Sequence, residues 1–172
     1  KIQFAVLDDK GRESLKETVD IQCLATMKPN LYILSIGTSK YKDSRYNLDY
    51  AAKDANDFAG IFNQQKDVYG EVKTKTITNE QATSMNIEQL KSFFADAKID
   101  DVVMVFVAGH GLLDANYDYF YGTYDVNFND PGKKGLAYEK LESLLDGIAP
   151  LKKILIMDTC HSGEVEEEEV LV

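Results

Sequence analysis

Three short stretches of the chain are almost entirely apolar, and a fourth alternates apolar with polar residues. The apolar stretches are residues 31–36, 102–108 and 154–157, each bounded by polar or turn-forming residues. Such stretches are typical of strands that are buried on both faces of a parallel sheet covered by helices. The alternating stretch, residues 72–77, predicts a strand nearer the edge of that sheet.

Helical periodicity fills the segments between these predicted strands. Apolar residues recur there three and four positions apart, which predicts helices with one buried stripe. The stripes lie in residues 49–65, 86–97 and 137–148. Thr83 or Asn86 can cap the second helix, and Gly147 with Pro150 ends the third. Alternating strands and helices predict an α/β fold with a mostly parallel sheet and helices on both faces.

The first 28 residues follow a different pattern. Two apolar stretches, residues 2–7 and 19–24, flank Asp9-Lys10-Gly11, a sequence that favours a turn. This pattern predicts a β-hairpin arm or the end of a preceding domain. We therefore expect three parts: residues 1–28, a main domain over 29–163, and an acidic loop or tail over 164–172.

The composition is that of an ordinary globular domain, with an acidic excess. The 172 residues include 29 acidic and 19 basic side chains, for a formal net charge of −10. Five glutamates lie in residues 164–172, so only about half of this charge belongs to the main body. The acidic balance argues against a nucleic-acid partner, and no stretch approaches the ~20 apolar residues of a membrane span.

The two cysteines, Cys23 and Cys160, are too few for a disulfide framework. Free thiols are typical of reducing compartments, so we expect a cytoplasmic protein. No signal peptide is visible after Lys1, because no basic start precedes an apolar stretch.

Both histidines and one cysteine follow the apolar stretches directly. Gly109-His110-Gly111 follows residues 102–108, and residues 158–163 (DTCHSG) follow residues 154–157. Ligands bind beyond the carboxyl ends of the strands in open parallel sheets, so these residues are expected at one edge. A thiolate with a nearby base and N–H donors is the machinery of a cysteine peptidase. Glycines on both sides of His110 allow close backbone approach.

These segments resemble the large-subunit part of the caspase-like cysteine peptidases. The spacing of 50 residues between His110 and Cys160 matches the caspase pattern. The resemblance covers about residues 30–164 and is closer to metacaspases and bacterial caspase-domain proteins than to animal caspases. It implies a three-layer sandwich with a mostly parallel sheet, from which the small-subunit strands are missing in this chain.

The resemblance also implies roles for individual residues. Cys160 would be the nucleophile and His110 the general base and later the general acid. The backbone N–H groups of Gly111 and Cys160 would form the oxyanion hole. His161 is an alternative base, although a residue next to the nucleophile usually points elsewhere.

Substrate specificity is expected from carboxylates. Asp158 stands where animal caspases carry a glutamine, and a desolvated carboxylate repels an acidic P1 side chain and pairs with Arg or Lys. The metacaspase resemblance implies Asp54 as the second substrate-binding carboxylate. Asp43, in the loop after the first predicted strand, is a further candidate.

No cofactor or metal is expected. Calcium activation is common among metacaspases, and hard oxygen ligands do follow His110. They are Asp114, Asp118, Asp125 and Asp130. We interpret them as loop charges, because Ala137-Tyr138-Glu139 replaces the acidic pair that metacaspases commonly carry near the next helix. The expected partners are a polypeptide with a basic P1 residue and the small-subunit half of the same protease, joined to this chain or cleaved from a zymogen.

Three other interpretations remain beside this one. A non-catalytic caspase-like scaffold would share the fold, but retention of both His110 and Cys160 argues against it. A flavodoxin-like nucleotide binder would share the strand and helix order, but the chain has no G-x-G-x-x-G or P-loop motif. Clostripain-like or gingipain-like peptidases would share the chemistry under a different family name.

Overall fold

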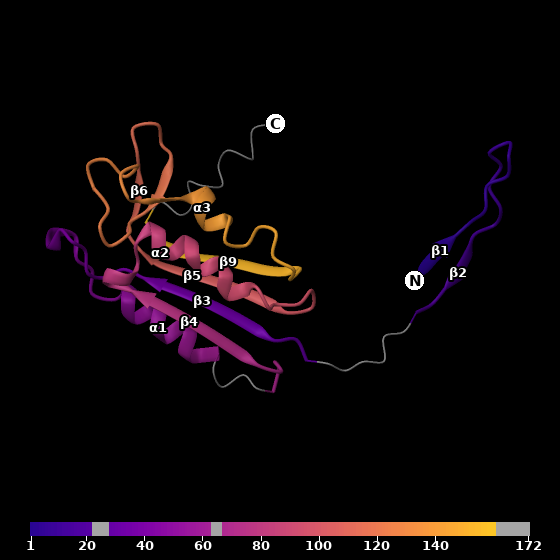
Figure 1. The fold of residues 1–172 in the computed structure, drawn as a ribbon, viewed down its shortest axis with the longest axis horizontal. Helices are drawn as coiled ribbons and strands as arrows, with labels where there is room; N and C mark the ends of the chain where they lie inside the picture. Colours follow the sequence, from indigo (N-terminus) through magenta and orange to yellow (C-terminus); the bar gives the residue numbers. More distant parts are fainter. Residues whose placement is uncertain (22–27, 63–66, 161–172) are drawn as a thin grey trace.

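The computed structural model describes residues 1–21, 28–62 and 67–160. Its centre is a four-stranded sheet in the order β4-β3-β5-β9, in which every neighbouring pair is parallel (Figure 1). The strands are β3 (Leu31–Gly37), β4 (Val72–Thr78), β5 (Val102–Gly109) and β9 (Lys152–Thr159). The strands expected from the sequence are confirmed.

Burial along the strands follows the pattern of the sequence. All seven residues of β3 are buried, and β5 is buried except for the half-buried Met104. The alternating strand β4 lies at one edge of the sheet, as predicted. β9 forms the other edge of the described sheet and is more exposed than its apolar sequence predicts. Its exposure arises because only β5 pairs with it among the described residues.

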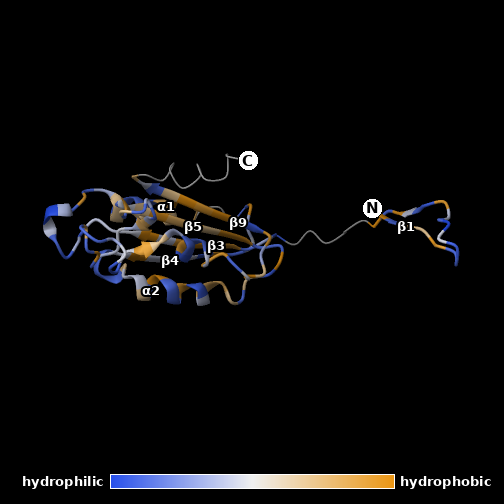
Figure 2. Cartoon of the chain, turned by 90° about the horizontal axis from the view of Figure 1, so that it is seen from above, coloured by the Kyte–Doolittle hydropathy of each residue, from blue (hydrophilic) through white to orange (hydrophobic). Residues whose placement is uncertain are grey.

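Helices cover both faces of this sheet (Figure 2). α1 (Ala51–Phe62) lies on one face, where Phe58 stacks on Phe106 with ring centroids 4.5 Å apart. Its alanines allow a close approach to β3. A Cβ at Gly37 would collide with the carbonyl oxygen of Ala51, so glycine is required there.

The opposite face is covered by shorter helices than the sequence predicts. α2 (Ser84–Gln89) begins after Thr83, which caps it by accepting the Asn86 N–H, and it continues as the 3-10 helix η3 (Leu90–Phe94). Buried Ile87 and Phe94 belong to the same apolar cluster as Leu34 and Val105 of the sheet.

The third predicted helix, residues 137–148, is too long. Only α3 (Tyr138–Glu142) is α-helical. The N–H groups of Leu144 and Leu145 donate to carbonyls three residues earlier, which tightens the chain into turns. Gly147 then adopts a φ of +62°, which ends the helical conformation earlier than the apolar stripe suggests.

A second, antiparallel sheet was not expected from the sequence. It has the order β6-β7-β8 and consists of β6 (Gly111–Leu113), β7 (Tyr119–Tyr121) and β8 (Leu136–Ala137). Gly111 pairs with Tyr121 and Phe120 with Ala137. Because β6 begins two residues after β5 ends, this small sheet lies at the carboxyl edge of the main sheet (Figure 1).

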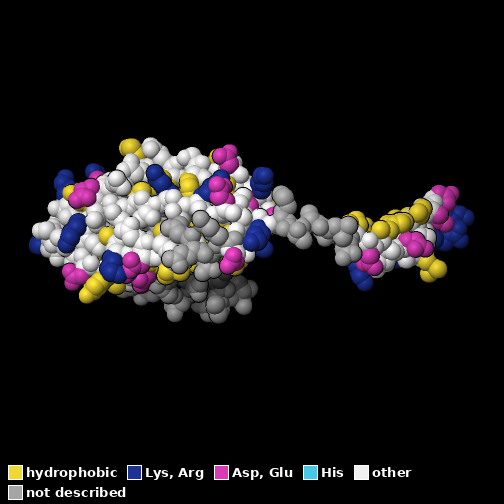
Figure 3. Space-filling view, turned by 90° about the horizontal axis from the view of Figure 1, so that it is seen from below, with side chains coloured by type: hydrophobic (Ala, Val, Ile, Leu, Met, Phe, Trp, Pro, Cys, Tyr) yellow, Lys and Arg dark blue, Asp and Glu magenta, His cyan; other side chains and the backbone are white. Residues whose placement is uncertain are grey.

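The amino-terminal segment forms the predicted hairpin. β1 (Ile2–Phe4) pairs antiparallel with β2 (Glu17–Val19), and Gly11 adopts a φ of +76° in the turn. Apolar side chains gather along one side of this arm (Figure 3). Residues 22–24 of the second predicted strand, with Cys23, lie outside the described residues. Within the described ranges, no helix is long and apolar enough to cross a membrane.

Candidate active site

The register of the main sheet brings His110 and Cys160 to neighbouring strand ends. β5 and β9 run parallel with Gly109 opposite Thr159, the last residue of each strand. His110 and Cys160 directly follow these two strand ends, at the edge of the sheet where sequence analysis expected them. His110 is half-buried, and Cys160 is exposed with a free thiol.

The backbone of Gly111 packs directly against Cys160. A Cβ at Gly111 would collide with the carbonyl oxygen of Cys160 and lie 2.7 Å from Tyr119 Oη. Only glycine therefore fits at this position. The arrangement places both expected oxyanion donors, the N–H groups of Gly111 and Cys160, on adjoining stretches of backbone.

Gly109 is required for a different reason. Its φ of +153° is one that side-chain-bearing residues rarely adopt. A Cβ there would also lie 3.1 Å from both Tyr41 Oη and a ring carbon of Tyr121. The glycine before His110 thus allows the strand end to pass between two tyrosines.

Two hydrogen bonds, one from its backbone and one from its side chain, fix the orientation of His110. Its N–H donates to Tyr41 Oη at 3.0 Å, and its side-chain Nε2 lies 2.9 Å from the carbonyl oxygen of Tyr46. A carbonyl can only accept, so Nε2 carries the hydrogen in this contact. In the neutral ring, Nδ1 then keeps its lone pair and can accept a proton.

Aromatic rings surround this histidine. Tyr46 and Phe128 stack with centroids 3.6 Å apart and planes 7° from parallel. The His110 ring stands edge-on to Phe128 at 5.4 Å and tilted against Tyr41 at 5.2 Å. Sequence analysis missed all three aromatic residues. Tyr41 and Tyr46 could have been suspected because they follow the first core strand at the same sheet edge, whereas nothing in the sequence marks Phe128.

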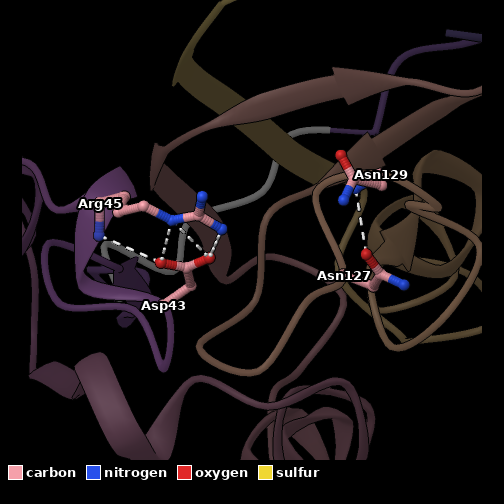
Figure 4. A network of polar contacts seen from close by, with 4 residues as sticks. All are labelled: Asp43, Arg45, Asn127 and Asn129. Carbon is pink, nitrogen blue, oxygen red and sulfur yellow. Dashed lines mark hydrogen bonds and ion pairs between the residues drawn. The ribbon is translucent and has the colours of Figure 1, made fainter.

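Polar contacts within each loop stabilise the two loops that carry the stacked Tyr46 and Phe128 rings (Figure 4). The Asp43 carboxylate binds the guanidinium and the N–H of Arg45, and Arg45 lies over the Tyr46 ring. In the other loop, Asn127 Oδ1 accepts the Asn129 N–H at 3.0 Å. Hydrogen bonds from Arg45 lower the pKa of Asp43. Asp43, the further specificity candidate, thus binds a cation of its own loop.

The two other specificity candidates lie toward the sheet face that α1 covers. Asp158 is exposed and pairs in register with Ala108, which packs in one apolar cluster with Ala51 and Ala55 of α1. Asp54 is half-buried and lies one helical turn before Phe58, toward the carboxyl ends of the strands. Neither carboxylate forms a hydrogen bond or salt bridge with another described residue.

The model of the caspase domain family, peptidase C14, matches residues 32–171. The chain belongs to the caspase domain family. The resemblance and the α/β fold class expected from the sequence are both confirmed.

A solved structure supports the same fold for this caspase domain. The crystal structure of protein GSU0716 from Geobacter sulfurreducens is similar at 22% sequence identity, with a TM-score of 0.58. The match covers 82% of this chain and 54% of that one, so the chain spans about half the length of its structural relative. No curated protein matches the sequence.

Three of the four loop acids considered as calcium ligands have other side-chain contacts in this caspase domain. Asp114 accepts the N–H groups of Asn116 and Asp118 in a turn. Asp125 and Asp130 bind the neighbouring lysines, Lys134 and Lys133 respectively. Within the described ranges, no group of three or more His, Cys, Asp or Glu residues could hold a metal ion. His161, the alternative base, lies outside them.

Proposed function

We propose that this caspase domain supplies the Cys-His dyad of a cysteine endopeptidase that cleaves after Arg or Lys. The observation that carries the proposal is the register of Gly109 with Thr159, which delivers His110 and Cys160 to adjoining strand ends. The contact of His110 Nε2 with Tyr46 supports it, because this tautomer leaves Nδ1 able to accept a proton.

In the proposed reaction, His110 Nδ1 takes the thiol proton and Cys160 Sγ attacks the scissile carbonyl carbon. The N–H groups of Gly111 and Cys160 stabilise the oxyanion of the tetrahedral intermediate. His110 returns the proton to the leaving amine as the C–N bond breaks, which leaves a thioester on Cys160. Water, deprotonated by His110, then hydrolyses this acyl-enzyme and restores the thiol.

The basic specificity rests on Asp158 and Asp54. Both lie toward the carboxyl end of the sheet on the α1 face, and neither forms a salt bridge with another described residue. Two carboxylates match the planar, forked donors of a guanidinium better than the compact charge of an ammonium group. We therefore expect cleavage after Arg to exceed cleavage after Lys.

A small-subunit half would complete the sheet and the cleft. β9 is an edge strand of the described sheet, and Ile154 on it is 42% exposed. Edge strands with apolar side chains favour pairing with further strands. The match to only about half of a longer structural relative is consistent with such a partner half. A reducing cytoplasmic compartment would keep the Cys160 thiol free.

Reporter peptides that differ only at P1 test the catalytic assignment. The protein assembled with its small-subunit half is expected to cleave Arg and Lys reporters and to leave an Asp reporter intact. Cys160→Ala and His110→Ala are each expected to abolish cleavage. Unchanged turnover in Cys160→Ala would refute the dyad. A wild-type protein that binds peptides without cleaving them would favour the non-catalytic scaffold.

Carboxylate variants test the specificity assignment separately. Asp158→Ala and Asp54→Asn are expected to lower kcat/KM for the Arg reporter about tenfold or more, as loss of a charge-assisted hydrogen bond implies. Alkylation of the Cys160 thiol should change much less. Asp57→Asn is the control, because Asp57 lies on the same helix and binds Lys53. Equal losses of cleavage and alkylation would indicate misfolding instead of a specificity role.

A further inference from the structure

The hydroxyl groups of Tyr119 and Thr159 form a hydrogen bond beside the candidate nucleophile. Tyr119 begins β7 and Thr159 ends β9, and their oxygens lie 2.7 Å apart. Tyr119 is only 7% exposed, and Thr159 is half-buried. Thr159 directly precedes Cys160, so this bond ties the small sheet to the backbone from which the nucleophile extends.

We propose that this hydroxyl bridge positions Cys160 for attack, with Tyr119 and Thr159 as positioning residues. The inference rests on the proposed function, because it presumes that Cys160 is the nucleophile. The bridge fixes the Thr159–Cys160 peptide and thereby the directions of the Cys160 N–H group and thiol. Neither hydroxyl takes part in proton transfer.

The end of β9 needs such support. β9 ends at Thr159, and the ends of strands open more readily than their centres, even where a strand of the small-subunit half pairs with the other side of β9. The register partner of Thr159 is Gly109, which offers no side chain to pack against. The Tyr119 hydroxyl therefore provides the side-chain contact that β5 does not.

The strand that carries Tyr119 is itself firmly attached near His110. Tyr121 is fully buried and donates to the carbonyl oxygen of Ala108 at 3.0 Å, while its oxygen lies 2.8 Å from the hydroxyl of Thr38. The Gly122 N–H donates to the His110 carbonyl oxygen at 2.8 Å. The short strand β7 thus holds the end of β5 through Tyr121 and the end of β9 through Tyr119.

Close packing leaves little freedom at this junction. A Cβ at Gly111 would meet both the Cys160 carbonyl oxygen and Tyr119 Oη. Burial raises the pKa of Tyr119 to about 12, although its hydrogen bond with Thr159 acts in the opposite direction. The phenol thus remains protonated at neutral and mildly alkaline pH, and the bridge persists there.

A double-mutant cycle tests the bridge in the protein assembled with its small-subunit half. Tyr119→Phe and Thr159→Val each remove one hydroxyl and keep most of the side-chain volume. Each is expected to lower kcat about three- to tenfold, with KM within about twofold. The double variant should be no slower than the slower single variant, because both changes remove the same bond. Additive losses would overturn the proposal.

Rescue and control variants separate positioning from general destabilisation. Thr159→Ser restores the hydroxyl and is expected to recover most of kcat. Tyr117→Phe makes the same chemical change at an 83% exposed tyrosine two residues before Tyr119 and should leave kcat unchanged. Thermal unfolding must show each variant folded at the assay temperature. A Thr159→Ser variant as slow as Thr159→Val would contradict the bridge.

Alkylation of Cys160 provides a readout that needs no turnover. Peptide mass spectrometry distinguishes Cys160 from Cys23, the other cysteine of the chain. Tyr119→Phe and Thr159→Val are expected to change the alkylation rate of Cys160 about threefold or more relative to Tyr117→Phe. Equal alkylation rates would overturn the bridge and leave the proposed function standing, whereas full turnover by Cys160→Ala would overturn the proposed function and the positioning role with it.

Discussion

The side chain of His110 donates from Nε2 to the carbonyl oxygen of Tyr46, 2.9 Å away. This contact selects one tautomer of the imidazole, which leaves Nδ1 as the proton acceptor. The carbonyl belongs to a loop residue whose ring stacks on Phe128 from another loop. The orientation of the proposed base therefore depends on an aromatic pair that joins two loops.

Removal of the Phe128 ring is expected to slow catalysis without abolishing it. In Phe128→Ala, the Tyr46 ring loses its stacking partner, so the backbone carbonyl of Tyr46 is held less firmly. The loss of such an aromatic pair costs about 0.5–1.5 kcal/mol. We expect kcat to fall about two- to tenfold. In ¹⁵N spectra, the share of the His110 tautomer protonated at Nε2 should also fall. The chain has only two histidines, so assignment is direct.

Two variants control this experiment. Phe128→Tyr keeps a stacking ring and should retain kcat. Phe62→Ala removes a half-buried ring at the far end of α1 and should lower stability while kcat stays unchanged. If Phe128→Ala lowers the melting temperature but leaves both kcat and the tautomer ratio unchanged, the aromatic pair does not orient the base.

The sequence was sufficient to predict the main sheet and the placement of His110 and Cys160 at the same edge of it. Almost unbroken apolar stretches identify strands buried on both faces, and carboxyl ends of parallel strands share one edge. The prediction needed only strand identity and direction. It did not need the conformation of any loop.

The supporting residues could not be predicted in this way. Tyr46 and Phe128 meet through two loops far apart in the sequence, and loop conformation leaves no periodic signal. The strands β6 to β8 are two or three residues long, too short to show an alternating pattern. The tyrosine contacts of β7 with both strand ends therefore became visible only in the structure.

A methyl group at Gly111 is expected to disrupt the site. In Gly111→Ala, the added Cβ would collide with the Cys160 carbonyl oxygen and crowd Tyr119 Oη. Overpacking of this kind costs about 1–3 kcal/mol, so the free energy of unfolding should fall by that amount. Cleavage of the Arg reporter should fall at least tenfold, because relief of the collision must displace Cys160.

Gly60 offers a matched control for the same substitution. It lies within α1, and a Cβ there meets no atom within 4 Å. Gly60→Ala is therefore expected to stabilise the protein by about 0.5–1 kcal/mol, as alanine does in helices, with unchanged cleavage. Chemical denaturation and the reporter assay measure both effects. Full activity in Gly111→Ala would show that Gly111 and Cys160 are not in such close contact.

The buried tyrosines around the site should delay alkaline ionisation. Burial raises the pKa of Tyr41 and Tyr121 and raises that of Tyr119 to about 12. Because the fold favours the neutral phenols, their contribution to stability is fully present below about pH 10 and is lost as the pH rises through the folded pKa values.

Absorbance at 295 nm measures this delay directly. At least three of the ten tyrosines should remain protonated at about pH 11 while circular dichroism shows a folded protein. In guanidinium chloride, all ten should ionise near pH 10, the ordinary value for a free phenol. Tyr119→Phe should reduce the delayed group by one. Ionisation of all ten below pH 11 in the folded protein would contradict the burial of these hydroxyls, because a desolvated phenolate is too costly to form before the surrounding structure opens.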